Sequence, residues 1–127
     1  CWGLASAGEV GQGSTEALGD NVGEMGDRLP AVNLGASRTA VEIAVGGEHV
    51  CARLDNGSVK CWGLASAGEV GQGSTEALGD NVGEMGDRLP AVNLGASRTA
   101  VEIAVGGEHV CARLDNGSVK CWGLASA

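Results

Sequence analysis

Residues 49–62 read HVCARLDNGSVKCW, and this stretch decides the fold. Two runs of strand-forming residues flank the turn triplet Asp55-Asn56-Gly57, which is the pattern of a β-hairpin. Two turns compete at this triplet. A two-residue Asn-Gly turn would pair Cys51 with Trp62, whereas a three-residue loop with a left-handed glycine would pair Cys51 with Cys61. We favour the three-residue loop, because opposed cysteines on adjacent strands lie close enough to form a disulfide.

The hairpin occurs twice because the whole chain is a tandem repeat. Residues 1–60 recur without a single change as residues 61–120, and residues 121–127 begin a third copy. A unit of this size buries too little apolar surface to be stable alone, so the copies are expected to stack on each other. We divide the chain into the end of a preceding repeat (1–7), a first repeat (8–67) and a second repeat (68–127).

Each repeat is predicted to contain about four short strands. The hairpin supplies two of them. Residues 39–45 form a third, because β-branched residues alternate along them, and two glycines then lead into the hairpin. Residues 28–34 are a weaker strand, placed at an edge or at the entry to the sheet by Pro30. Residues 8–27 are a glycine-rich acidic loop. The fold class is therefore all-β, with tandem identical four-stranded units.

The charge balance argues against two classes of partner. The chain has 16 acidic and 8 basic side chains and a net charge of −8. Nucleic acids need clustered Lys and Arg that displace counterions from the phosphates, and the sequence has no such cluster. An anionic membrane surface is disfavoured for the same reason. The sequence also lacks a run of 18 apolar residues, so no membrane insertion is expected.

Four segments of the repeat share a spacing with a known family. They are CWG at 1–3, GEVGQG at 8–13, IAVGGEHVCA at 43–52 and DNGSVKCWG at 55–63. Their order resembles the regulator-of-chromosome-condensation repeat, with its W-G-x-N-x-x-G-Q-L-G, A-x-G-x-x-H-x-x-A-L and D-G-x-V-x-x-W-G pattern. The departures are Ala5 for Asn, Glu9 for Gln, Val10 for Leu and a longer insertion at 18–27. With its cysteines, the repeat looks like the secreted bacterial branch of that family.

The resemblance implies a β-propeller, in which each repeat is a four-stranded blade. Members of the family include a nucleotide exchange factor and an inhibitor of β-lactamases. The exchange factor works through differences between its blades, and identical copies have none. We therefore take the architecture from the resemblance and leave those functions aside.

The cysteines have a regular spacing across the predicted hairpins. Cys51 and Cys61 lie ten residues apart, as do Cys111 and Cys121, which predicts one disulfide in each repeat. Disulfides fit an oxidising, extracellular or cell-surface location. The alternative is that these are buried free thiols in a reducing compartment. A zinc site is disfavoured, because no repeat holds four ligands at metal spacing, and Cys1 is left without a partner.

Two further kinds of site are candidates, each with a simpler explanation. Oxygen-bearing side chains on the acidic loop could bind calcium; they are Asp20, Asn21, Glu24, Asp27, Asp80, Asn81, Glu84 and Asp87. The simpler explanation is a solvated loop whose charges meet neighbouring arginines. Asn56 and Asn116 stand in N-glycosylation sequences. The hairpin turn, however, itself demands these residues.

The sequence favours a structural or binding role over catalysis. A catalytic site usually draws different residues from different places, whereas this chain repeats one set. His49 and His109 are interpreted as core or hydrogen-bonding residues, and the three tryptophans as packing residues. The leading hypothesis is an extracellular structural protein whose blades self-associate with identical repeats into a filament, a surface array or a multi-chain ring. The alternative is a recognition module that binds a protein or glycan through its repeated loops. Apart from the candidate calcium, no cofactor is expected.

Overall fold

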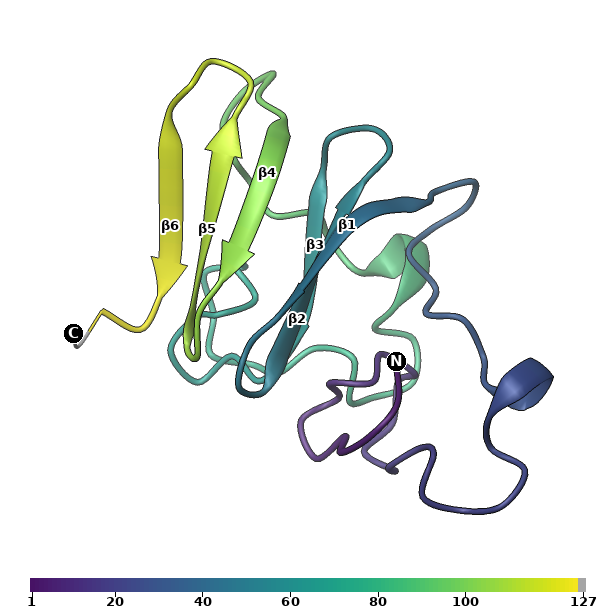
Figure 1. The fold of residues 1–127 in the computed structure, drawn as a ribbon. Coiled ribbons are helices and arrows are strands. Elements are labelled where there is room, and N and C mark those ends of the chain that lie inside the picture. The colour runs from purple at the N-terminus through teal and green to yellow at the C-terminus, as the bar shows by residue number, and fades with distance from the viewer. Residues whose placement is uncertain (126–127) are drawn as a thin grey trace.

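The computed structural model describes residues 1–125 and contains two three-stranded antiparallel sheets, which stand side by side (Figure 1). The first sheet is formed by β1 (Ala40–Val45), β2 (His49–Leu54) and β3 (Val59–Gly63), and the second by β4 (Ala100–Val105), β5 (His109–Leu114) and β6 (Val119–Gly123). Two short 3-10 helices, η1 (Gly26–Arg28) and η2 (Gly86–Arg88), interrupt the long loops. The prediction of an all-β repeat is confirmed. The helices within residues 1–125 are too short to cross a membrane.

The hairpin has the three-residue loop that the sequence favoured. Leu54 N donates to Ser58 O at 2.9 Å, and Gly57 adopts the left-handed φ of +82° that the turn requires. The resulting register sets Cys51 directly opposite Cys61. The second hairpin has the same register, with Cys111 opposite Cys121.

Each sheet has three strands and not the four that the sequence predicted. Arg28 is the last residue of η1, and residues 29–34 form no strand. In the second copy one backbone bond, from Val92 N to Val59 O at 2.7 Å, joins the corresponding segment to β3. Pro30 and Pro90 have no amide hydrogen to donate, which removes one ladder bond from each segment. The segment therefore lies beside the sheet without becoming a strand.

Alternation along the strands gives each sheet two different faces. We call one the tryptophan face; in the first sheet it carries Ile43, Val50, Ala52, Leu54, Lys60 and Trp62. We call the other the disulfide face; in the first sheet it carries Glu42, Ala44, Cys51, Arg53, Val59 and Cys61. The second sheet carries the same residues sixty positions later.

The main core lies between the two sheets. The disulfide face of the first sheet packs against the tryptophan face of the second sheet. Buried members of this core include Cys51, Val59, Cys61, Ala100, Ile103, Val110, Ala112 and Leu114. A second core covers the tryptophan face of the first sheet with loop residues from both copies, among them Val32 and Leu89. The two blades thus stack with a fixed direction, one face onto the other.

Candidate functional site: the blade faces and the loop between them

Backbone hydrogen bonds fasten one blade to the next. Ala100 N donates to Gly57 O at 2.8 Å, and Gly47 N donates to Gly107 O at 3.0 Å. A side chain adds a third bond, because Glu42 Oε1 accepts from Ile103 N at 3.2 Å. Glu42 also pairs with Arg53 at 2.8 Å, so its charge is compensated at the contact. The stacking contact therefore combines apolar packing with specific polar bonds.

Part of each outer blade face is open, at opposite ends of the chain. On the first tryptophan face the open part is β1, because loop residues cover Val50 and Trp62. Ile43 is 64% exposed on the first tryptophan face, whereas its counterpart Ile103 is 5% exposed at the contact. Val119 is 62% exposed on the second disulfide face, whereas its counterpart Val59 is fully buried. The open faces are thus the two halves of the contact that the blades already make. Figure 1 shows β6 on one side of the molecule and the long loop of the first copy on the other.

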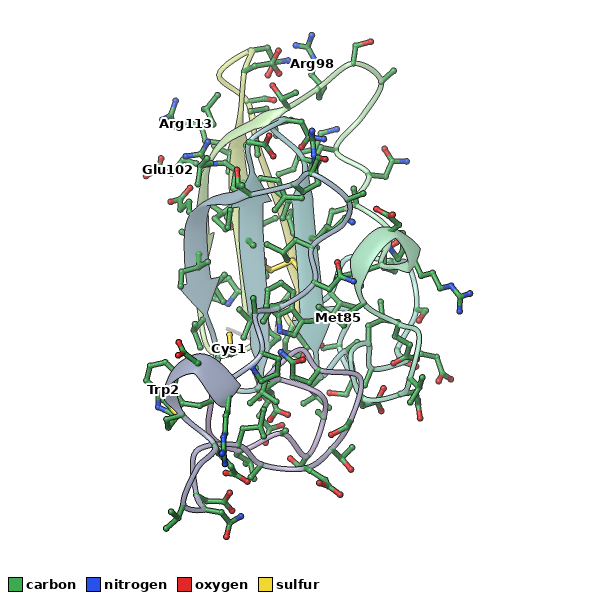
Figure 2. The ribbon with its side chains drawn as sticks, turned by 90° about the vertical axis from the view of Figure 1, so that its right-hand side faces the viewer. Cys1, Trp2, Met85, Arg98, Glu102 and Arg113 are labelled. Atoms are coloured by element: carbon green, nitrogen blue, oxygen red, sulfur yellow. A yellow bond between two sulfur atoms is a disulfide. The ribbon has the colours of Figure 1, made fainter. Side chains whose placement is uncertain are left out.

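The two disulfides have the same connectivity but different surroundings. The structure joins Cys51 to Cys61 and Cys111 to Cys121, each within one hairpin. The first pair is fully buried between the blades. In the second pair Cys111 is half-buried and Cys121 exposed, because no segment of residues 1–125 covers the second disulfide face. Cys1 is a free, exposed cysteine. Figure 2 places it, with Trp2, at the end of the sheets remote from Arg98.

His49 is buried where the glycine turns of the two blades meet. Its side chain is 1% exposed, and its Nε2 has no hydrogen-bond partner within residues 1–125. Burial is the main reason why the pKa of His49 is lowered; a backbone hydrogen bond involving His109 and the Glu69 carboxylate act in the opposite direction. A neutral imidazole at this contact agrees with the packing role that the sequence suggested. The counterpart His109 is exposed.

The acidic loop directs its carboxylates toward its own backbone. Glu24 Oε2 accepts hydrogen bonds from the amides of Gly19, Asp20 and Asn21 at 2.7, 3.1 and 3.0 Å. The bond to Asn21 N is the main reason why the pKa of Glu24 is lowered. Within residues 1–125, no three His, Cys, Asp or Glu side chains are grouped so that they could hold a metal ion. Calcium binding by this loop remains a prediction.

The candidate glycosylation site lies on the hairpin tip, and the turn uses the same side chain. Asn56 is exposed, and its Oδ1 accepts from Ser58 N at 3.1 Å and from Ser58 Oγ at 2.7 Å. Asn116 makes the same two bonds with Ser118. The turn chemistry accounts for these residues, and modification stays a prediction.

The loop of the second copy also fills a groove on the first blade, which sequence reasoning missed. Lys60 Nζ donates to Gly86 O at 2.9 Å and to Leu34 O at 2.9 Å. Gly86 N donates to Asn33 O at 2.8 Å, and Asp87 Oδ1 accepts from Ala36 N at 2.9 Å. These partners lie far apart in the sequence, and no local pattern links them. Asp87, a candidate calcium ligand, is thus engaged in the contact between the loop and the first blade.

Comparison with known proteins finds one family model that matches part of each repeat. Residues 40–69 and 100–126 match the family model described as regulator of chromosome condensation (RCC1) repeat. No curated protein matches the sequence. The matched segments hold all six strands and both disulfides, but not the long acidic loop.

Solved structures share the arrangement of both blades. Prp20p from Saccharomyces cerevisiae is 23% identical with a TM-score of 0.64, over 97% of this chain and 27% of that chain. Human WBSCR16 is 18% identical with a TM-score of 0.62, over 92% of this chain and 27% of that chain. Yeast RCC1 (Prp20) bound to Kap60 is 23% identical with a TM-score of 0.65, over 100% of this chain and 28% of that chain. This chain spans about a quarter of each of these structures, and it has the fold of two successive RCC1-type propeller blades.

Proposed function

We propose that the chain is a non-catalytic structural repeat whose blades stack head to tail on further copies of the same repeat. The observation that carries this proposal is the reversed burial of identical residues at the two ends. Ile103 and Val59 are buried where the blades meet, and their counterparts Ile43 and Val119 are exposed. Because the sequences are identical, the open disulfide face of one chain fits the open β1 part of the tryptophan face of another, as the first blade packs on β4 within the chain.

The stacking has a direction, and this decides which assemblies can form. A contact between two different faces is heterologous, so it propagates into a filament or closes into a ring according to its rotation. Propellers close with about four to eight blades. Two to four chains of this length could therefore supply a ring, whereas a different rotation would give an open array.

The proposed setting is extracellular or at the cell surface, in a protein of the cysteine-bearing secreted branch. One disulfide in each hairpin supports it, because such bonds persist in oxidising compartments. The proposal keeps the repeat boundaries at residues 8–67 and 68–127. The three strands of each sheet lie inside these ranges.

The proposal is tested by measuring the molar mass of the purified chain by light scattering over a range of concentrations. We expect species larger than the 12.6 kDa monomer. Ile43→Glu and Val119→Glu each place a charge on an open face, and each should reduce association. Val22→Glu is the matched control, because its counterpart Val82 stays 96% exposed beside the blade contact. A folded monomer at all concentrations would refute the proposal.

A second candidate function is recognition of a protein partner through the exposed loops. It is favoured by the likeness to Prp20p, whose structure was reported with its binding to Gsp1p and histones, and to yeast RCC1 bound to Kap60. Loop variants such as Asn56→Asp would then change partner binding and leave stacking intact. Ile43→Glu and Val119→Glu would instead reduce stacking. Measuring association and partner binding for the same variants therefore distinguishes the two functions.

A further inference from the structure

We infer that the groove at the open end of the second repeat binds the loop at residues 18–29 of a second copy of this chain, and that Lys120 is the residue that recognises it. This inference rests on the proposed head-to-tail stacking, and it names a segment that would stabilise the contact between two chains. The groove is lined in part by Gly71, Gly73, Asn93, Leu94 and Lys120, and its volume is about 530 Å³.

The same groove is already filled once inside the chain, which shows what fits it. In the first repeat the equivalent positions are Gly11, Gly13, Asn33, Leu34 and Lys60. The loop from Leu78 to Leu89 lies on them and hydrogen bonds through Gly86 and Asp87. A Cβ atom added at Gly13 would lie 3.0 Å from Asn81 O, whereas one at Gly73 would meet no atom of residues 1–125 within 4 Å. The described part of the chain therefore leaves the second groove open, and the groove has the residues that hold the loop in the first repeat.

The loop that would fill it is exposed in the first repeat. Met25 is 44% exposed and Gly26 is exposed, whereas their seated counterparts Met85 and Gly86 are half-buried and buried. Lys120 Nζ donates to Leu94 O at 2.9 Å, as Lys60 donates to Leu34 O. Among residues 1–125 it has no counterpart of the second bond, from Lys60 to Gly86 O. In the assembly Gly26 O of the second copy supplies that acceptor, and Asp27 accepts from Ala96 N.

One internal contact must be exchanged for the loop to seat in this way. Gly63 and Leu78 exchange two backbone hydrogen bonds, of 2.7 and 3.1 Å, where the loop enters the first groove. In a second copy Leu18 makes the same two bonds with its own Gly3, of 2.7 and 3.2 Å. Gly123 of the neighbouring copy must take the place of Gly3. Both glycines stand in the sequence CWGL, so the bonds lost and gained are alike.

The experiment compares the association of four chains by sedimentation velocity. Lys120→Glu puts a carboxylate against a backbone carbonyl, so its dissociation constant should rise about tenfold or more. Arg88→Glu changes the net charge equally at an exposed side chain that does not line the second groove, and it should stay close to wild type. A chain of residues 8–127 lacks the competing Gly3, so it should associate more tightly than the full chain. Melting curves check that every variant is folded.

The outcomes separate this inference from the proposed function. Association of Lys120→Glu equal to that of Arg88→Glu would overturn the loop contact while leaving stacking intact. Weaker association of chain 8–127 would overturn the exchange at Leu18. A wild-type chain that never associates would remove the proposed stacking and the loop contact together.

Discussion

The two blades have the same sequence but not the same environment, so the differences between them report what a neighbour contributes. On the tryptophan face, Ile103 of the second blade is 5% exposed and Ile43 of the first is 64% exposed. On the disulfide face the order is reversed, with Val59 buried and Val119 62% exposed. The exposed fraction of these side chains therefore depends on whether a neighbouring blade covers them, as well as on the fold of their own repeat. Each blade is half of an interface.

The largest expected effect is the loss of unfolding free energy on replacing a tryptophan, and it should differ among the three positions. Trp62 is 2% exposed and its Nε1 donates to Glu9 O at 2.9 Å, so Trp62→Ala should cost about 3–5 kcal/mol of unfolding free energy. Trp122 makes the same bond, to Glu69 O, but is only half-buried, and its loss should cost roughly half as much. Trp2 is 65% exposed, so Trp2→Ala should cost about 0.5 kcal/mol or less.

Urea unfolding followed by circular dichroism measures the three free energies. The experiment should use a concentration at which the chain is monomeric, because stacking would bury Trp2 and Trp122 further. Similar losses at all three positions would contradict the asymmetry, and would mean that the blades are stable independently of each other.

The disulfides should give the next largest difference. Each bond closes a loop of about eleven residues, so replacing both cysteines of a pair with alanine should cost about 3 kcal/mol or less. The Cys51–Cys61 pair should cost more than the Cys111–Cys121 pair, because its sulfur atoms also fill the core between the blades. Denaturation of the two double variants checks the order.

Access to reductant should follow the same asymmetry. Cys121 is exposed and Cys61 is fully buried, so a limiting amount of reductant should open the Cys111–Cys121 bond first. Thiol labelling with peptide mapping identifies the opened bond against the constant signal of free Cys1. Opening of both bonds at one rate would show that the blade contact does not protect sulfur.

Much of the blade could be predicted from the sequence, because its signals are local. The turn triplet and the facing cysteines gave the register, and the repeat gave the tandem arrangement. The prediction of a fourth strand at residues 28–34 was wrong. Pro30 has no amide hydrogen to donate to a neighbouring strand, and the tight turn of η1 extends to Arg28. The groove contact of Lys60 could not be predicted, since its acceptor Gly86 belongs to the next copy.

A smaller effect is expected from His49 and pH. The folded-state pKa of His49 is lowered, mainly by burial, so the folded chain resists protonation more than the unfolded chain does. Stability should be complete above a pH of about 6.5 and should fall as the pH drops from there toward the lowered folded pKa. His49→Gln should remove this part of the pH dependence. His109→Gln, at the exposed counterpart, should keep it. Thermal melts of the three chains between pH 7 and pH 5 make the comparison.

The smallest effect is expected from calcium, and the two loops should again differ. In the first repeat Glu24 already accepts three backbone amides, so a cation would have to compete with bonds that hold the loop in place. Binding would therefore be weak, and a chelator should lower the melting temperature by no more than a few degrees. Asp27 is exposed, whereas Asp87 is engaged with Ala36 N, so the loop at 18–29 should account for the change. Asp27→Asn should then remove the response to chelator, and Asp87→Asn should keep it. If the wild-type chain melts at the same temperature with and without chelator, the calcium prediction is contradicted. The acidic loop is then held by its own hydrogen bonds, and its remaining role is the contact with the groove.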